Sequence, residues 1–252
     1  MRVDLNCDAG ELPEAIADGS QEAILRQVTS ANIACGGHAG DAQMMRETIQ
    51  QALRCGVAIG AHPGYVDRAN FGRIALALSS EELAASVYRQ VVALADIAEG
   101  CGARIGHVKA HGALYNQAAQ DRAIASAIAE GVARWRKDVV LVGLAGSVML
   151  EEFRAAGFAV AAEGFADRKY EADGSLRPRR FRDALLHEPA EAAAQALRVA
   201  KEGSVVEANG AMVPLKVQTI CIHGDTPGAA QIAAAVRHAL EDAGITVQAL
   251  DG

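Results

Sequence analysis

The stretch "RVDLNCDAGE", Arg2 to Glu11, decides the fold prediction. Successive side chains of a β-strand point to opposite faces, so the polar residues Asp4, Asn6 and Asp8 would share one face. The residues between them are apolar and would share the other face. A strand that is apolar on one side and acidic on the other needs a polar interior or a binding site beside it.

A second segment, "QTICIHGD" at residues 218–225, repeats this alternation. Its Cys221, His223 and Asp225 would face one way, opposite two isoleucines. Polar residues at the carboxyl ends of several strands are typical of a βα barrel, whose sites are built from different loops. In an open sheet they would gather at a single crevice. The pattern therefore favours a closed or nearly closed barrel.

Short apolar runs alternate with Ala-rich amphipathic stretches along the whole chain, which predicts repeated βα units and a parallel sheet. No linker, low-complexity tract or fixed-period repeat interrupts them, so we predict one α/β barrel domain over residues 1–252. The predicted strands are "RVDLNC", "SANIAC", "GVAIGAH", "RIGHVKAH", "DVVLVGLAG", "FAVAAEGFA" and "QTICIHGD".

Cap and turn signals bound several elements. Ser79 and Glu82 form a capping box that predicts the start of a long helix, and Gly100 marks its end. Two hairpins are predicted in loops, "KYEADGSLRPR" at residues 169–179 and "SVVEANGAMVPL" at residues 204–215.

Composition excludes several classes of protein. The chain has 252 residues, 51% of them hydrophobic, and a formal net charge of -7, which argues against a nucleic-acid surface. No apolar leader and no membrane-length apolar window is present. The five cysteines are odd in number and contain no C-x-x-C, which favours a reducing compartment. We therefore expect a cytoplasmic protein that binds neither membrane nor nucleic acid.

Six predicted strand ends carry chemically useful residues. Most place an acid or an imidazole beside glycine, which permits close approach of the backbone to a ligand. They are "NCDAGE" (6–11), "GGHAGD" (36–41), "GAHPG" (60–64), "HVKAHGALYN" (107–116), "EGFADR" (163–168) and "HGD" (223–225).

Several of these residues also admit structural roles. Asp41 has the position of a helix cap, and Asp225 could be a solvated neighbour of a helix start. Asp167 and Arg168 could form a structural ion pair. His107 is expected to be a buried, hydrogen-bonded histidine deep in the barrel, away from its mouth, since it lies four residues before the strand end.

A metal site is possible but cannot be assigned from spacing, because no H-E-x-x-H or similar signature occurs. Its candidate ligands are imidazoles from four strands and one carboxylate, while Lys109 in their midst would oppose a cation. These ligands are His38, His62, His111, His223 and Asp8. No phosphate loop or G-x-G-x-x-G turn is present, so any ATP is held atypically or by another chain.

Six collinear motifs together resemble the LamB/YcsF family, and the resemblance runs from Asp4 to about Asp225. They are "DLNCDAGE", "SANIACGGHAGD", "GVAIGAHPGYVDRANFGR", "HVKAHGALYN", "FADRKY" and "TICIHGD". The resemblance implies a distorted (β/α)7 TIM-like barrel, similar to the glycoside hydrolase and deacetylase barrels. It also implies an ATP-dependent 5-oxoprolinase, which opens 5-oxo-L-proline to L-glutamate with two companion subunits, B and C. ATP with Mg²⁺ would then be the cofactor of the complex.

On this basis we predict residue roles at the barrel mouth. Lys109, helped by Arg73, would neutralise anionic charge, and Asp8 or His111 would be the general base. Catalytic support is predicted for His38 and Asp225, and substrate contacts for Asn6, Glu11, Asp41, His62, Arg73 and His223. Two alternatives remain open, a stand-alone metal-dependent amidohydrolase or deacetylase and a non-catalytic ligand-binding subunit.

Overall fold

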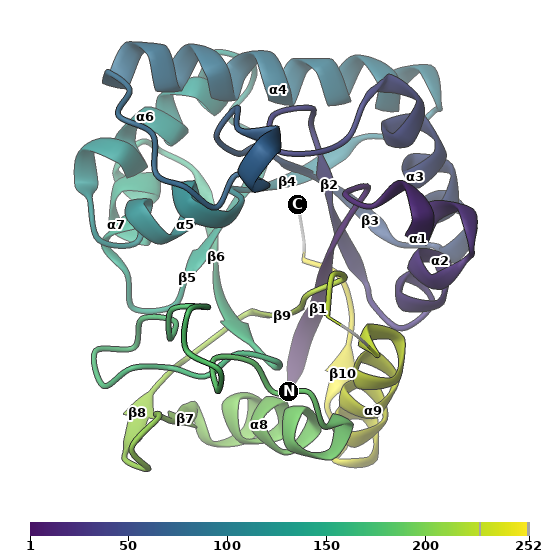
Figure 1. Cartoon of the computed structure of the whole chain (residues 1–252), viewed down its shortest axis with the longest axis vertical. Coiled ribbons are helices and arrows are strands. Elements are labelled where there is room, and N and C mark those ends of the chain that lie inside the picture. Colours follow the sequence, from purple (N-terminus) through teal and green to yellow (C-terminus); the bar gives the residue numbers. More distant parts are fainter. Residues whose placement is uncertain (227, 251–252) are drawn as a thin grey trace.

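Seven parallel strands close into a barrel in the computed structural model, which describes residues 1–226 and 228–250 (Figure 1). Each strand pairs with its neighbour in chain order, and the last returns to the first with Thr219 beside Asp4. This confirms the predicted α/β barrel. The strands are β1 (Arg2–Ala9), β2 (Ser30–Ala34), β3 (Ala58–His62), β4 (Ile105–Lys109), β5 (Val140–Leu144), β6 (Ala159–Phe165) and β9 (Thr219–Ile222).

Helices surround the barrel (Figure 1). The predicted capping box begins α4, where Ser79 and Glu82 each accept a hydrogen bond from the other's main-chain N–H. No described helix is both long enough and apolar enough to cross a membrane. The helices are α1 (Pro13–Ala17), α2 (Ser20–Leu25), α3 (Ala42–Cys55), the 3₁₀ turn η1 (Arg68–Asn70), α4 (Ser80–Gly100), α5 (Gly112–Ala118), α6 (Arg122–Ala133), α7 (Val148–Ala155), α8 (Pro189–Glu202) and α9 (Ala229–Asp242).

The two predicted hairpins differ in regularity. The later one is an antiparallel ribbon of β7 (Ser204–Val206) and β8 (Met212–Pro214), as expected. The earlier one is looser, because Tyr170 and Leu176 form an isolated bridge, with Gly174 in the left-handed conformation between them. The segment between β6 and α8 is therefore largely irregular, and several of its side chains lie at the mouth of the barrel.

Strand β1 divides its side chains between two layers, as its sequence predicts. Its apolar residues belong to the main core, together with helical residues such as Leu25 and Ile49. Asp4, Asn6 and Asp8 instead bond side chains of other strands inside the barrel. The hydrophobic layer thus lies between strands and helices, and much of the lumen is left to polar groups.

The amino end of the lumen holds a small apolar cluster separate from the main core. Val140, Val142 and Ala161 form it, and Leu250 packs against it. Leu250 follows β10 (Thr246–Val247), a short strand that pairs with the first residues of β1. The last described residues therefore cover the end of the barrel opposite the candidate site.

His107 is part of the polar filling of the lumen. Its Nε2 donates to Asn32 Oδ1 over 2.9 Å, and its ring lies where a Cβ on Gly60 would come within 2.1 Å of it. Burial, with added repulsion from Lys109 and His62, lowers the pKa of His107 to about 4. The prediction that His107 is a buried, hydrogen-bonded histidine inside the barrel is confirmed.

This pKa predicts an acid-side loss of stability. An unfolded histidine has a pKa of about 6.5, so unfolding takes up a proton at His107 below that pH. Stability should fall as the pH drops from about 6.5 to about 4, by up to roughly 3 kcal/mol from this group. His107→Gln keeps a donor for Asn32 but cannot titrate, so its urea-unfolding free energy should change less between pH 7 and pH 4.5. His238→Gln, at an exposed position, should behave like the wild type; equal slopes for all three proteins would contradict the prediction.

Candidate active site

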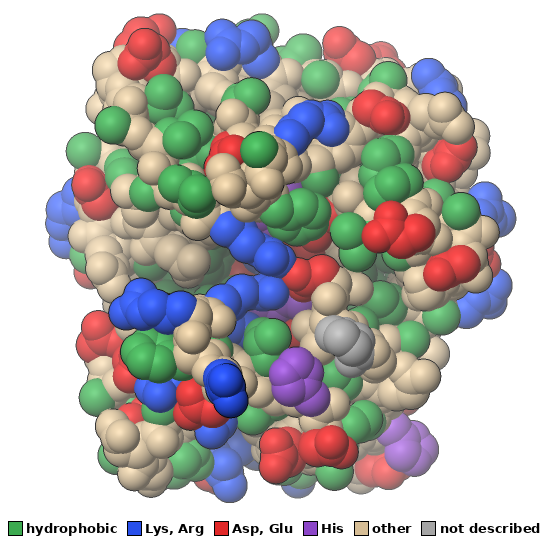
Figure 2. Space-filling model, viewed as in Figure 1, with side chains coloured by type: hydrophobic (Ala, Val, Ile, Leu, Met, Phe, Trp, Pro, Cys, Tyr) green, Lys and Arg blue, Asp and Glu red, His purple; other side chains and the backbone are tan. Residues whose placement is uncertain are grey.

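A cavity of about 830 Å³ opens at the carboxyl ends of the barrel strands. Figure 2 shows its mouth as a hollow bordered by Lys and Arg side chains. Strand ends, α5 and the irregular segment after β6 contribute its wall. This is the end of a βα barrel at which loops from different strands meet.

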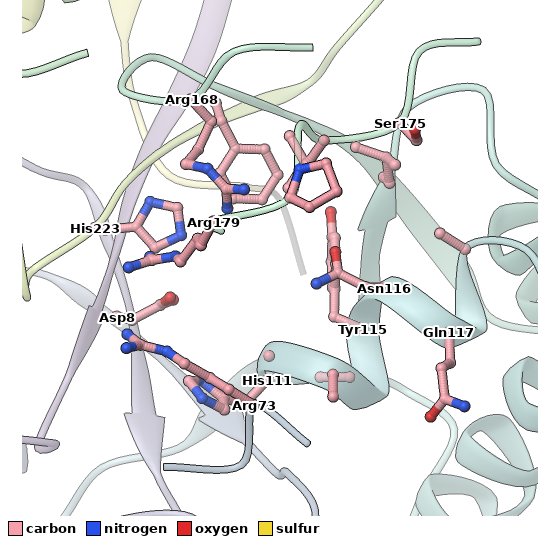
Figure 3. A pocket seen from close by; sticks show the side chains of 18 of the residues that line it. Asp8, Arg73, His111, Tyr115, Asn116, Gln117, Arg168, Ser175, Arg179 and His223 are labelled. Carbon is pink, nitrogen blue, oxygen red and sulfur yellow. The ribbon is translucent and has the colours of Figure 1, made fainter. Parts of the chain in front are cut away.

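Most residues predicted from the sequence line this cavity. Figure 3 shows several of them pointing into the same space from different elements. The lining residues among them are Asp8, Glu11, His62, Arg73, Lys109, His111, His223 and Asp225. Asn6 and His38 lie behind this wall, in contact with lining residues, and Asp41 lies elsewhere. Strands far apart in the sequence thus deliver acids, imidazoles and a cation to one place.

Lys109 is buried between two carboxylates. Its Nζ lies 3.0 Å from Asp8 Oδ1, 2.9 Å from Glu163 Oε1 and 3.1 Å from Cys221 Sγ. Burial lowers the pKa of Lys109, but the attraction of Asp8, Cys221 and Glu163 outweighs it and holds the pKa well above the ordinary value. Lys109 is therefore a fixed cation whose charge is already shared.

Glu163 and Tyr115 complete this network, and neither was among the predicted site residues. Glu163 accepts hydrogen bonds from Asn6 Nδ2 over 3.0 Å and from the Tyr115 hydroxyl over 2.7 Å. The alternation of side chains along a strand could have placed Glu163 in the lumen, since Ala161, Glu163 and Phe165 share a face of β6. Glu163 begins the predicted strand end "EGFADR", but no role was predicted for it.

Asp8 joins the lysine to the imidazoles. Its Oδ1 accepts from Asn32 Nδ2 over 2.9 Å as well as from Lys109, and its Oδ2 is 3.4 Å from His62 Nε2. Burial raises the pKa of Asp8, but His62 and Lys109 more than offset this, so the pKa lies well below its usual range. Asp8 is accordingly ionised and a weak proton acceptor.

A compact cluster of three imidazoles and one carboxylate lies beside Asp8. His111 Nδ1 is 3.0 Å from His62 Nε2 and 3.2 Å from Glu11 Oε1. His38 Nε2 lies 2.9 Å from the same oxygen, and all four donor atoms lie within 4.8 Å of one another. Imidazole and carboxylate are preferred ligands of zinc-like ions, so this cluster could hold a metal.

Main-chain carbonyls fix two of these rings. His62 Nδ1 donates to Lys109 O over 2.8 Å, and His111 Nε2 donates to Phe71 O over 2.9 Å. Phe71 has a φ of 54°, a left-handed conformation that is costly for a bulky residue. This backbone conformation places the Phe71 carbonyl against the His111 ring. The carbonyl can only accept a hydrogen bond, so a proton lies on His111 Nε2.

His38 packs behind the cluster. Its ring stacks on His111 with centroids 3.6 Å apart and planes within 2°. Burial lowers the pKa of His38 to about 4, which the hydrogen bond to Glu11 offsets only in part, so this imidazole is neutral at pH 7. Its Nε2 is then free to donate to the Glu11 carboxylate.

His223 is oriented by a buried carboxylate. Its Nδ1 lies 2.9 Å from Asp167 Oδ1, its main-chain N–H donates to Oδ2 over 3.1 Å, and its ring stacks on Phe165. Because Nδ1 serves Asp167, Nε2 is the nitrogen left for the cavity that His223 lines. Asp167 thus pairs with His223 and not with Arg168, the structural ion pair that the sequence also allowed.

Arginines gather at the rim of the cavity, as Arg73, Arg168, Arg179 and Arg180 all line it. Arg73 and Arg179 both bind the Asp225 carboxylate, so Asp225 is a bridge at the rim rather than a solvated neighbour. Burial, reinforced by repulsion from Arg179, lowers the pKa of Arg168 to about 10, at which it is still charged at neutral pH. The rim therefore carries an excess of positive charge suited to carboxylate or phosphate.

Asp41 has a structural role. Its Oδ1 accepts from the main-chain N–H groups of Gln43 and Met44, both over 2.9 Å, and caps α3 from an exposed position. The alternative of a helix cap is confirmed. The substrate contact predicted for Asp41 gains no support, because the carboxylate is engaged outside the cavity.

Comparisons with known proteins identify the family. The sequence profile of the LamB/YcsF family matches residues 3–252. The chain belongs to the LamB/YcsF family. Among its relatives, the A subunit of 5-oxoprolinase from Chloroflexus aggregans is 52% identical over 248 residues, covering 98% of both chains. The protein of the same name from Bordetella pertussis is 50% identical over 247 residues, again covering 98% of both.

Solved structures agree with this LamB/YcsF assignment. The lactam utilization protein of Thermus thermophilus superimposes with a TM-score of 0.92 at 44% identity, over 99% of this chain and 100% of that one. A family 4 carbohydrate esterase of Streptomyces lividans matches with a TM-score of 0.53 at 10% identity, over 99% and 93%. The second likeness shows only that the barrel is shared, as the resemblance to deacetylase barrels implied.

Removing the charge of Glu163 should destabilise the barrel. Glu163→Gln leaves the buried Lys109 with Asp8 alone, and breaking one side of a buried pair costs about 3 kcal/mol. Urea unfolding at pH 7 measures this loss. Glu171→Gln, which loosens the half-exposed contact with Arg177, should cost less than about 1 kcal/mol. Equal losses in the two variants would show that the lysine does not depend on Glu163.

Proposed function

We propose that this chain is the lactam-binding and ring-opening subunit of an ATP-dependent 5-oxoprolinase, which converts 5-oxo-L-proline to L-glutamate. Relatives named as the A subunit of 5-oxoprolinase match it over nearly their whole length at about half identity. ATP with Mg²⁺ would be handled by two companion subunits, B and C, since the sequence lacks a phosphate loop. Its five free cysteines suit the cytoplasm.

The observation that carries this proposal is the division of the cavity into an arginine rim and a base of acids and imidazoles. Arg73, Arg179 and Arg180 could hold the carboxylate of a small cyclic amide, or a phosphoryl group on it, by bidentate contacts. We assign anion binding to this rim rather than to Lys109, because Lys109 is buried against two carboxylates, whereas Arg73 and Arg179 share a single one, that of Asp225.

The chemistry explains why ATP is needed. A five-membered lactam is an unreactive amide. Transfer of the γ-phosphoryl group of ATP to the lactam oxygen makes the carbonyl carbon more electrophilic. Water then adds to that carbon and loses a proton to a base. The resulting adduct can expel phosphate, which restores the lactam, or nitrogen, which opens the ring and leaves an acyl phosphate. A second water cleaves the acyl phosphate to glutamate and phosphate.

Protonation of the ring nitrogen selects the productive route, so the site needs a group that takes a proton from water and returns it to nitrogen. His223 suits this role, because Asp167 fixes its Nδ1–H and leaves Nε2 for the cavity. Asp8 suits it less well, since Lys109 and Asn32 already occupy its Oδ1. His111 likewise turns its free nitrogen to His62 and Glu11.

Reconstitution tests the function. The chain with both companion subunits, ATP and 5-oxoproline should release glutamate and ADP in equal amounts. Neither this chain alone nor the two companions alone should form glutamate. Glutamate from the isolated chain without ATP would overturn the proposal.

Loss of the His223 imidazole should slow turnover. We expect His223→Gln to lower kcat of the assembled complex by about 10²- to 10⁴-fold, the usual effect of a positioned proton carrier. His187→Gln, at an exposed position outside the cavity, is the matched control and should keep wild-type kcat. Full activity of His223→Gln in an intact complex would favour the alternative in which this chain only binds the ligand.

A metal-dependent hydrolase that works without ATP is the second candidate. The cluster of Glu11, His38, His62 and His111 is the observation that favours it. Amide or ester cleavage by the isolated chain, lost on chelation and independent of ATP, would decide for this alternative.

A further inference from the structure

When both rings are neutral, His62 and His111 turn unprotonated nitrogens toward each other. A carbonyl oxygen only accepts, so the bonds to Lys109 O and Phe71 O place the ring protons on His62 Nδ1 and His111 Nε2. In neutral rings the facing atoms, His62 Nε2 and His111 Nδ1, then both carry lone pairs at 3.0 Å. Two lone pairs repel at that distance unless a cation is shared between them.

Carboxylate oxygens complete a ligand cage around this point. Glu11 Oε1 is 3.2 Å from His111 Nδ1 and 3.9 Å from His62 Nε2, and Asp8 Oδ2 is 3.4 Å from His62 Nε2. Zinc–nitrogen bonds of about 2.0–2.1 Å in a tetrahedron put neighbouring ligand atoms about 3.3 Å apart. The observed spacings scatter around that value, so little movement is needed to bind an ion.

His38 does not fit as a further ligand. A metal ion lies near the plane of each imidazole that binds it, and the rings of His38 and His111 are parallel and stacked 3.6 Å apart. One ion cannot lie in both planes. His38 instead donates to Glu11 Oε1 over 2.9 Å. Glu11, His62 and His111 thus each have an outer partner that orients them, which is the usual arrangement around metal ligands.

We propose that Glu11, His62 and His111 bind one divalent cation of the zinc class at the base of the cavity. Charge supports a cation at this point, because the Glu11 carboxylate lies beside His38, His62 and His111, and Asp8 lies beside His62. Lys109 contacts Asp8 and Glu163, so its charge does not serve Glu11.

The site resembles a catalytic metal site, which keeps one coordination position open, rather than a structural site, in which protein ligands fill every position. Three protein ligands with a free position are typical of catalytic zinc. All three ligands line the cavity, and Figure 3 shows His111 and Asp8 at its edge. A bound ion would polarise a carbonyl or phosphoryl oxygen there. The proposal does not depend on the lactam function, since metal binding is measured without substrate or ATP.

Direct metal binding tests the site. The purified full chain is stripped with a chelator, incubated with Zn²⁺, passed through gel filtration and analysed for metal by mass spectrometry. We expect one zinc ion per chain and a higher melting temperature with zinc than without it. Substitution of Co²⁺ should give visible absorption bands typical of nitrogen and oxygen ligands, without a thiolate charge-transfer band.

Matched variants locate the ion. His111→Gln and Glu11→Gln should bind zinc at least about 100-fold more weakly in competition with a chromophoric chelator, because each removes a ligand. His38→Gln removes only an outer partner and should weaken binding by about 10- to 100-fold. His107→Gln, a buried histidine outside the cluster, should bind like the wild type.

Two results would overturn the proposal. One is the absence of stoichiometric zinc and of any cobalt spectrum in the folded wild-type chain, which would leave a shared proton between His62 and His111. The other is zinc bound by His111→Gln and Glu11→Gln as tightly as by His107→Gln. Should a ligand variant fail to fold, the cobalt spectrum of the wild type still decides, since bands from thiolate ligands would place the ion elsewhere.

Discussion

A lysine enclosed by carboxylates organises the interior of this barrel. Lys109 on β4 contacts Asp8 on β1 and Glu163 on β6, and so joins three strands across the lumen. A buried ammonium costs several kcal/mol unless its partners are in place, so the strand register that supplies them is favoured over registers that do not. The same contacts fix Asp8 beside His62, which sets the position of the imidazole cluster. The polar lumen therefore contributes to the specificity of the fold as well as to the site.

The alternation of polar and apolar residues made the barrel predictable. It assigned Asp8 and Lys109 to the lumen because a strand period of two leaves little choice once one face must be buried. The same rule applied to β6 would have found Glu163, but an isolated acid in an apolar strand has no partner in its own segment. Its partners, Asn6 and Tyr115, come from distant parts of the chain. Long-range pairing of this kind is set by closure of the barrel and is not written in any local pattern.

Other features of the site depended on geometry that sequence patterns do not encode. Asp167 was matched with its chain neighbour Arg168, although it pairs with His223, 56 positions away in the chain. Phe71 adopts a left-handed backbone that its residue type disfavours, so the support it gives His111 could not be foreseen. Arg73 was predicted, but the other arginines of the rim, Arg168, Arg179 and Arg180, come from an irregular segment without periodicity, in which no pattern predicts which side chains turn inward.

The irregular segment after β6 also has a consequence for how this barrel can diverge. It contributes Arg179 and Arg180 to the cavity rim, whereas the buried charges around Lys109 belong to the barrel strands. Substitutions at Arg179 and Arg180 would change what the entrance attracts without altering the contacts of Lys109 with Asp8 and Glu163. Asp167 lies in the same segment but binds His223, so it is tied to the reactive part of the site. The charge of the entrance can therefore diverge at a few positions while the buried network stays intact.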